Sequence, residues 1–236
     1  MNVNYANHLY EVKGELMNNN GKLTYQLETT TDKRIVYSLD GNEPVYLLYP
    51  EYKELIAIDS STTIKANVID ENGKQLGNTF TQKINLHKAV GKKITLNVKP
   101  NKAYDTGGKQ ALINGISGNN KRFGDAEWLG FFQEDVEITI NFEKPTEINS
   151  ISTRFHNGNG QWIYAPKKVL ISFDENDFES FHLENSEELL VNFNQLFKNK
   201  KASKILLKIP NYGIIPEGRQ GAGQKPWTFI DEIIVE

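Results

Sequence analysis

Residues 158–166, with the sequence GNGQWIYAP, place Trp162 and Tyr164 two positions apart between a glycine-rich turn and a proline. In a strand, side chains two positions apart lie on the same face. The preceding segment alternates as well, and its apolar residues leave Arg154 and His156 on the opposite face. Aromatic rings that cover a sugar and donors that bind its hydroxyls suit a carbohydrate site. We therefore predict that these four side chains form a carbohydrate-binding cluster.

The register of Ile163 decides between two interpretations of this cluster. If Ile163 is buried in a strand, both neighbouring rings face outward; if the rings fill the core, Ile163 is exposed. The alternative role for Trp162 is a structural anchor beneath the loops, as for many sandwich tryptophans. We expect Trp128 and Trp227 in the core. Arg219, in the segment EGRQGAGQ, is expected to face a ligand or solvent, and we add it to the predicted carbohydrate site.

The sequence contains no recognisable catalytic motif. Its four histidines show no metal-ligand spacing, and nucleophile-elbow, phosphate-loop and dinucleotide-binding motifs are absent. The acidic segments ENDFES and ENSEELL could supply the paired carboxylates of a glycosidase. Such segments are more typical of solvated loops, and a catalytic acid also needs a pocket that raises its pKa. We predict that this chain has no catalytic residues.

The segment YDTGGKQALINGISG, residues 104–118, is rich in glycine, so its backbone carbonyls are open to a cation. Calcium takes six to eight oxygen ligands, often carbonyls together with a carboxylate. Glu232, near the last strand, could complete such a site if the ends of the domain meet. The other interpretation is that the glycines only make turns and bind no ion.

Most of the sequence alternates with the period of two residues that is typical of half-buried strands. The alternation is clearest in six segments: 21–30, 33–41, 61–70, 135–142, 167–174 and 203–210. Asn-Gly and Asp-Gly dipeptides mark tight turns between several of them. Only residues 187–197 suggest a short helix. Many short strands separated by turns predict antiparallel β-sandwiches.

The polar stretch HKAVGKK, residues 87–93, lies between two predicted strands and marks a domain boundary. We predict one domain at residues 1–88, an immunoglobulin- or fibronectin-like sandwich. A second domain at 89–236 is expected to be a larger sandwich with longer loops, and loops on a rigid sandwich commonly bind ligands. The fold class is therefore all-β, with two β-sandwiches in tandem.

Composition excludes several classes of function. The net charge of −3 gives no reason to expect a polyanionic partner, which disfavours nucleic-acid binding. The chain has no cysteine, which excludes disulfides, cysteine-bound zinc and thiol catalysis. No apolar run approaches the roughly 18 residues of a membrane-spanning helix. The start of the chain lacks a basic segment followed by an apolar stretch, so we expect no signal peptide in it.

Two stretches of the first predicted domain resemble a known family. They are IVYSLDGNEP, residues 35–44, and PEYKELIAIDSSTTIKANVIDENGK, residues 50–74. They are similar to the C-terminal sandwich of bacterial chitobiases and β-hexosaminidases, which shows a tyrosine, Leu-Asp-Gly and Glu-Pro pattern before a Thr-Ile-Lys-Ala strand. The matching positions are Tyr37, Leu39 to Gly41, Glu43-Pro44 and Thr63 to Ala66.

The second predicted domain resembles a discoidin-like domain, also called a coagulation factor type C or galactose-binding-like module. The matching stretches are ALINGISGN, EWLGF, DVEITINFEKPTEINSISTRF, WIYAPKKVLISFDENDF and WTFIDEIIVE. This family usually has Asp-Gly where the chain has Asn114-Gly115, which weakens one calcium-linked position but leaves the carbonyls. A second usual Asp-Gly is replaced here by residues 174–176. From the resemblance we therefore expect a structural Ca²⁺ site that includes Asn114 and Glu232.

The order of the two domains is similar to the C-terminal tail of family 20 glycoside hydrolases of Bacteroidetes. Their catalytic barrel is absent from this chain, so the resemblance implies a noncatalytic accessory fragment. It implies glycans ending in galactose or N-acetylhexosamine as partners, an upstream catalytic domain of the same polypeptide, and an extracytoplasmic location. The alternative is a pair of structural spacer domains with no ligand of their own.

Overall fold

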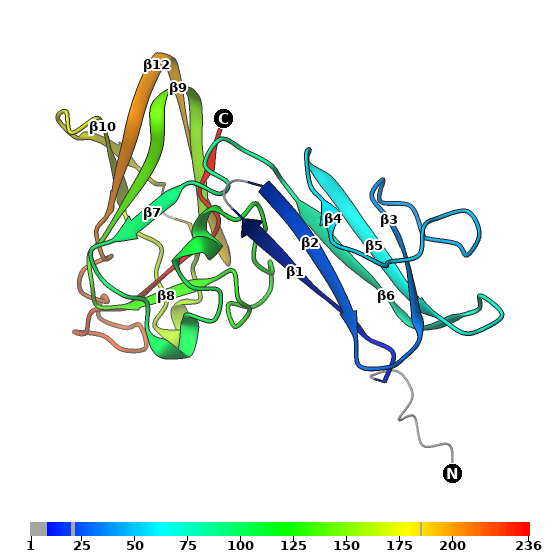
Figure 1. Ribbon diagram of the computed structural model, residues 1–236. Coiled ribbons are helices and arrows are strands. Elements are labelled where there is room, and N and C mark those ends of the chain that lie inside the picture. Colours follow the sequence, from blue (N-terminus) through cyan, green and yellow to red (C-terminus); the bar gives the residue numbers. More distant parts are fainter. Residues whose placement is uncertain (1–8, 20–21, 185) are drawn as a thin grey trace. The chain divides into compact units, whose positions relative to one another are not determined.

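The computed structural model describes residues 9–19, 22–184 and 186–236. The chain divides into two compact units, Met1–Leu86 and His87–Glu236, and nearly all of their regular secondary structure is strand (Figure 1). The predicted all-β class with two sandwiches is confirmed. The division lies two residues before the predicted limits of 1–88 and 89–236.

The first unit contains two three-stranded antiparallel sheets. One sheet has the order β1-β2-β4 and the other β3-β5-β6. Their bounds are β1 Val12–Asn19, β2 Lys22–Thr29, β3 Arg34–Ser38, β4 Ile56–Ala57, β5 Thr62–Ile69 and β6 Gln75–Ile84. Tyr25 and Leu27 of β2 and Ile64 and Ala66 of β5 are buried, with the period of two that the sequence predicts. The last part of β5, residues 66–69, is buried on both faces.

The second unit contains eight strands joined in one sheet of order β11-β10-β12-β9-β13-β8, with β7 and β14 also paired to β9. Their bounds are β7 Lys93–Leu96, β8 Leu129–Phe132, β9 Val136–His156, β10 Lys168–Phe173, β11 Glu179–His182, β12 Leu190–Ile209, β13 Trp227–Ile230 and β14 Ile234–Val235. Three short 3-10 helices lie between strands: η1 Lys102–Tyr104, η2 Lys109–Ile113 and η3 Asn159–Gln161.

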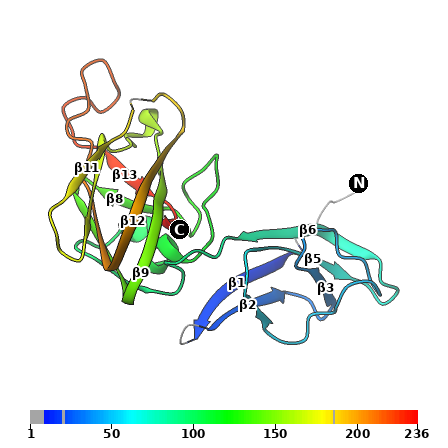
Figure 2. The ribbon, with the colours of Figure 1, turned by 90° about the horizontal axis from the view of Figure 1, so that it is seen from above.

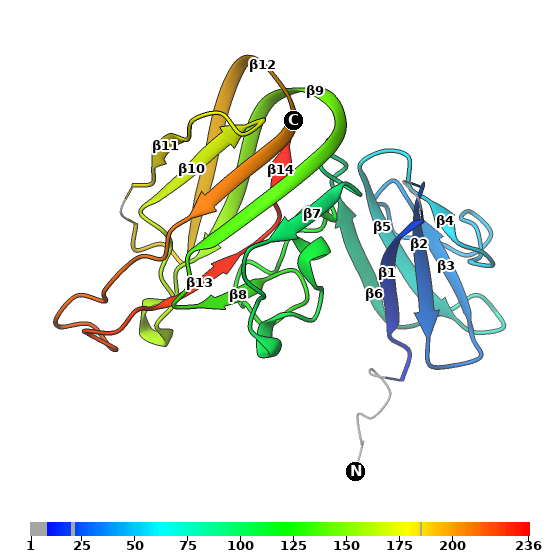
Figure 3. The same cartoon turned by 60° about the vertical axis from the view of Figure 1, so that its left-hand side comes forward.

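Two long strands, β9 and β12, run through both layers of the second unit (Figure 3). Each bends near a residue with positive φ, Glu143 at 65° and Asn199 at 53°. The first half of β9 pairs with the second half of β12 and with β7, whereas its second half pairs with β13 and β14. The sheet therefore folds over itself into the two layers of a sandwich.

The core of the second unit lies between these layers. Val136, Ile138 and Ile140 of β9 are fully buried, and so are Ile205 and Leu207 of β12. Full burial of each such side chain contributes about 1.5–3 kcal/mol. None of the helices in the described ranges is long and apolar enough to cross a membrane.

The predicted short helix at residues 187–197 is wrong, because most of this segment is the first part of β12. Val191 and Phe193 are buried, while Asn192 and Asn194, which alternate with them, are exposed. This burial has a period of two, and pairing with β9 fixes it.

Two loops meet at one end of the second unit. The loop between β12 and β13, drawn orange to red, lies at the same end as the yellow-green turn that follows β9 (Figure 2 and Figure 3). Both segments contain residues that the sequence predicts to bind a carbohydrate.

Candidate functional site

Trp162 ends the short helix η3 in the left-handed conformation, with φ of 61°. Its amide donates to the carbonyl of Asn159 over 3.2 Å. Because this segment is a helical turn and not a strand, strand alternation does not apply to it. Ile163 and Tyr164 are both buried, at 1% and 4% exposure, whereas Trp162 is partly exposed. The prediction that Trp162 and Tyr164 share an outward face is therefore wrong.

The indole of Trp162 packs on the loop between β12 and β13. It covers Gly221, where an added Cβ would lie 2.6 Å from the indole Cε2. Gly221 also has φ of 83°, which favours glycine. The Trp162 carbonyl accepts from the Trp227 amide over 2.8 Å. These contacts favour the role of an anchor for the loop that carries Arg219.

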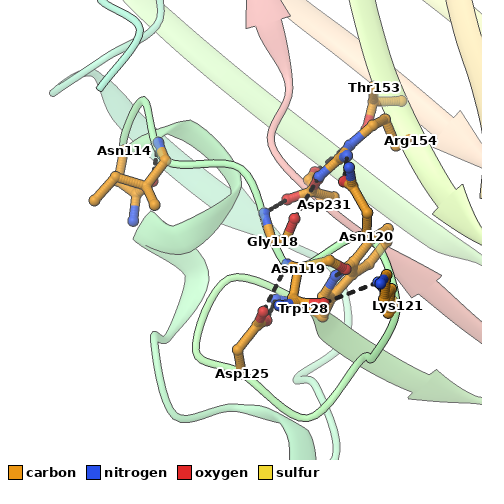
Figure 4. Close-up of polar contacts among 11 residues, drawn as sticks. Asn114, Gly118, Asn119, Asn120, Lys121, Asp125, Trp128, Thr153, Arg154 and Asp231 are labelled. Carbon is orange, nitrogen blue, oxygen red and sulfur yellow. Dashed lines mark hydrogen bonds and ion pairs between the residues drawn. The ribbon is translucent and has the colours of Figure 1, made fainter. Parts of the chain in front are cut away.

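Arg154, on β9, is held inside a network of polar contacts with the loop that precedes β8 (Figure 4). Its Nε donates to Asp231 Oδ2 over 2.6 Å, and its Nη2 pairs with the same oxygen. Nη2 also donates to the carbonyl of Gly118 over 2.8 Å, and Nη1 to Asn120 Oδ1 over 2.6 Å. The guanidinium carbon lies 5.5 Å from the centre of the Trp128 ring. Arg154 thus stabilises this loop, and its donors already have partners within the fold.

Asp231 is the buried partner of Arg154, with a side chain that is 0% exposed. Burial raises the pKa of Asp231, while the guanidinium and the Gly118 amide act to lower it. The amide donates to Asp231 Oδ1 over 2.9 Å. The carboxylate therefore ties β9 and the loop before β8 to the end of β13.

His156, at the end of β9, lies on the same face of the strand as Arg154 but is covered by aromatic side chains. It is 1% exposed, and its ring centre lies 4.9 Å from that of Phe123 and 5.7 Å from that of Trp128. Both ring nitrogens are buried without a hydrogen-bond partner among the described residues. Burial lowers the pKa of His156. As placed here, His156 is a core residue and does not reach a sugar.

We expect His156→Phe to raise the free energy of unfolding by about 1 kcal/mol at pH 7, because it removes two unpaired buried nitrogens. The folded protein disfavours the charged imidazole, so the unfolded chain binds the additional proton as the pH falls below about 6.5. This histidine therefore lowers wild-type stability on acidification, and the variant should lose that contribution. Thermal unfolding at pH 7.5 and 5.5 measures both effects. An equal loss of stability on acidification in the two proteins would contradict the prediction.

Glu232, between β13 and β14, is buried with both carboxylate oxygens facing N–H donors. Oε1 lies 2.6 Å from His87 Nε2 and accepts from the Gly115 amide over 2.8 Å. Oε2 accepts from the Asn114 amide over 3.2 Å, while Asn114 Oδ1 accepts from the Ile116 amide over 2.8 Å. Burial raises the pKa of Glu232 well above its usual value and lowers the pKa of His87 to about 4. The structure thus brings Asn114 and Glu232 together through a hydrogen bond from the Asn114 amide.

This donor arrangement does not suit a calcium ion at Asn114 and Glu232. Calcium takes oxygen ligands, and the side-chain oxygens of both residues are turned toward amide and imidazole N–H groups. Within the described ranges, no group of three or more histidine, aspartate, glutamate or cysteine side chains is placed to hold a metal. A bound calcium ion therefore remains a prediction. The side chains of Asn114 and Glu232 do not support it.

A cavity of about 240 Å³ lies at the loop end of the second unit. Its walls come from the turn after β9, the segment before β12 and the loop between β12 and β13. Tyr164 and Arg219, two of the predicted site residues, are part of this wall. The other lining residues are Asn157, Asn159, Ala165, Pro166, Lys167, Leu183, Glu184, Ser186, Glu187, Val191, Tyr212 and Pro216.

Asn157 joins two walls of the cavity. Its Oδ1 accepts from the Ala165 amide over 3.2 Å. Its Nδ2 donates to the carbonyls of Ser186, over 2.8 Å, and Glu188, over 3.2 Å. Because the Asn157 side chain is buried and uses both its oxygen and its nitrogen, the cavity has a preformed shape.

Two polar atoms in the wall of the cavity lack partners among the described residues. They are the Tyr164 hydroxyl and Asn159 Oδ1, and both are buried. The Tyr164 ring packs 4.9 Å from Tyr212. Burial raises the pKa of Tyr164, so its hydroxyl stays protonated at neutral pH and can donate as well as accept. An unsatisfied buried polar group costs about 1–3 kcal/mol. Both atoms are closed off from solvent, so a ligand hydroxyl would reach them only after a shift of the wall.

The charges around the cavity are balanced. Arg219 Nη2 donates to Glu187 Oε1 over 2.8 Å, and both side chains are exposed. Lys167 Nζ lies 4.2 Å from the centre of the Tyr212 ring. With Glu184, the wall carries two cations and two carboxylates. This balance favours an uncharged, hydroxyl-rich ligand.

Of the five residues predicted for a carbohydrate site, the structure brings Tyr164 and Arg219 to one cavity and places Trp162 against the loop of Arg219. Arg154 and His156 serve the fold instead. Sequence reasoning missed other wall residues: Asn157, Asn159, Lys167, Glu187 and Tyr212. The available signal was the sequence HNGNG, since asparagine in a glycine-rich turn commonly bonds the backbone through its side chain.

Residues 14–81 match the family model of the chitobiase/beta-hexosaminidase C-terminal domain. The matched residues all lie in the first unit. The match confirms the resemblance that the IVYSLDGNEP stretch predicts for the chitobiase-type unit. A comparison with the curated proteins found no match to the chain.

Several solved structures are similar to this chain at low identity. A fucose-binding module of Streptococcus pneumoniae is 15% identical, with 64% of this chain and 94% of the module covered and a TM-score of 0.42. A chitosan-binding module from a chitosanase/glucanase of Paenibacillus sp. IK-5 is 10% identical, with 64% and 98% covered and a TM-score of 0.40. A module of Clostridium perfringens in complex with GalNAc-β-1,3-galactose is 17% identical, with 61% and 93% covered and a TM-score of 0.38.

Proposed function

We propose that the second unit is a carbohydrate-binding module whose cavity takes one terminal sugar residue of a glycan. The observation that carries this proposal is the cavity itself, whose wall combines the ring of Tyr212 with the polar side chains of Lys167 and Arg219. Ligand sites are typically concave and carry a few fixed polar groups. The volume of about 240 Å³ favours a single residue over a longer segment. Galactose and N-acetylhexosamines are the sugars that we expect.

The chitobiase-type match of the first unit supports the wider role. We propose that the chain is a noncatalytic accessory fragment of a β-N-acetylhexosaminidase-like glycoside hydrolase, attached to an upstream catalytic domain in an extracytoplasmic compartment. The family is described as a C-terminal domain of chitobiases and β-hexosaminidases. A module on such an enzyme would hold it near glycan ends.

The expected affinity is weak. A sugar that covers about 100 Å² of apolar wall gains about 2.5 kcal/mol. A few net hydrogen bonds add about 1 kcal/mol each, and ordering the ligand offsets part of the gain. The balance is near −4 kcal/mol, which corresponds to about millimolar binding. Attachment to an enzyme would make this useful, because linked modules act at about millimolar effective concentration.

The test is an NMR titration of the whole chain with methyl glycosides of galactose, N-acetylglucosamine and N-acetylgalactosamine. We expect saturable millimolar binding of at least one, and about tenfold weaker binding by Tyr212→Ala, which removes an aromatic wall. Leu196→Ala is a matched control, because Leu196 is exposed and lies outside the cavity. No binding of any of these sugars at several millimolar would refute the carbohydrate-binding proposal.

A second candidate function is a structural spacer with no ligand. The packing of Trp162 on Gly221 and the Arg154–Asp231 pair favour it, because both use predicted ligand residues inside the fold. The same titration separates the two candidates, since a spacer binds none of the sugars.

A further inference from the structure

A second hollow, of about 380 Å³, lies next to the cavity in the second unit. It is lined by residues of β11, the segment that follows it and the first part of β12. The hollow and the cavity share four wall residues: Leu183, Glu184, Ser186 and Val191. The two hollows therefore adjoin a common wall, and we call the second one the β12 groove.

The lining of the β12 groove includes polar and apolar side chains from both faces of β12. Asn192 and Asn194 are exposed, and Gln195 is partly exposed. Phe193 alternates with the two asparagines onto the opposite, buried face of β12, where its ring centre lies 6.4 Å from that of Phe181. Amide side chains can both donate to and accept from sugar hydroxyls. The groove thus combines an apolar surface with hydrogen-bonding groups, as a sugar chain requires.

The backbone adds further hydrogen-bonding groups. Residues 190–196 of β12 pair with β9 on one side. On their other side, no strand of the described part of the chain pairs with them, because β10 pairs with β12 only at residues 205–208. A strand edge without a partner leaves amide and carbonyl groups free to bind a ligand.

The charges of the β12 groove restrict the ligand. Its lining includes the carboxylates of Glu184 and Glu188 and no lysine or arginine. Carboxylates repel sulfated and sialylated glycans, whose charges have the same sign. Uncharged sugars meet no such penalty.

We propose that the β12 groove binds the sugar residues that follow the terminal one, so that the second unit recognises the end of an uncharged oligosaccharide and not only a monosaccharide. This inference rests on the proposed function of the cavity. It assigns to Asn192 and Asn194 contacts with the inner sugars, and to the cavity the terminal sugar.

The test compares N-acetylglucosamine with chitotriose, and galactose with β-1,4-galactotriose, by calorimetric or NMR titration of the whole chain. We expect the wild type to bind the trisaccharide of at least one pair about tenfold more tightly than its monosaccharide. The variant Asn192→Ala/Asn194→Ala should keep the monosaccharide affinity and lose this gain. Asn149→Ala is the matched control, because Asn149 is exposed on β9 outside both hollows. Thermal unfolding checks that each variant is folded.

Three results would overturn the inference, and they can be told apart from one another. If monosaccharides bind and trisaccharides bind no better, the cavity proposal stands and the groove does not. If the gain survives in the double asparagine variant, the inner sugars bind elsewhere. If no sugar binds at all, both proposals fail. Tighter binding of a sulfated trisaccharide than of its neutral counterpart would also contradict the expected charge preference.

Discussion

Arg154→Met is expected to lower the free energy of unfolding of the second unit by about 3–5 kcal/mol, because it leaves Asp231 as a buried charge without its cation. The Asp231 side chain is 0% exposed, and Arg154 contacts it through both Nε and Nη2. The substitution also removes the donors to the Gly118 carbonyl and to Asn120. Chemical denaturation of wild type and variant measures the difference.

Two further variants separate the buried charge from other causes. Arg154→Met combined with Asp231→Leu should recover a large part of the loss, because replacing both members of a buried pair is often nearly neutral. Arg219→Ala, which removes the exposed pair with Glu187, should cost at most about 1 kcal/mol. A loss of the same size in the Arg154 and Arg219 variants would contradict the account of the Arg154 network.

Trp128→Ala is the second large effect, with an expected loss of about 3–5 kcal/mol from the cavity it leaves in the core. Trp128 is 0% exposed and packs with Ile163 and Phe229. Its Nε1 donates to the carbonyl of Asn119 over 3.1 Å, and that carbonyl would lose this partner. Thermal unfolding followed by near-ultraviolet circular dichroism measures the loss.

Trp162→Ala is the matched control for Trp128→Ala. Trp162 is partly exposed and contacts the Gly221 loop, so its removal should cost clearly less than the removal of Trp128. We expect it to loosen that loop and weaken sugar binding in the cavity. Equal destabilisation by the two substitutions would contradict this prediction, because Trp162 would then contribute as much to the stability of the unit as the buried Trp128.

The sheet structure could be predicted because core burial in a sandwich has a simple period. Val136, Ile138 and Ile140 alternate with polar residues, and the structure buries all three. The segment at 187–197 was wrongly predicted as a helix, because the spacing of its leucines and phenylalanines fits a helix as well as a strand. Pairing with β9, a contact distant in sequence, decided between the two.

The site could be predicted only in part, because its geometry depends on tertiary contacts. The left-handed φ of Trp162 removed the alternation on which its outward face was predicted. The role of Arg154 depends on Asp231, which lies 77 positions away in the sequence. The sequence placed His156 on the correct face of β9. It could not show that Phe123 and Trp128 cover the imidazole, because both lie far from His156 in the sequence. Tyr164 and Arg219 line the cavity because of the conformation of their loops, and strand register does not determine their positions.

The two long strands of the second unit have a consequence for how ligands can be detected. Since β9 and β12 belong to both layers, neither layer can come apart while the other stays intact, and we expect the unit to melt in one cooperative step. A sugar bound at the loop end would then stabilise the whole unit and not only the nearby loops. At ten times its dissociation constant, a ligand adds about 1.4 kcal/mol to the free energy of unfolding. The melting temperature should therefore rise measurably even with weakly bound glycans, so it can be used to screen a broad panel of them.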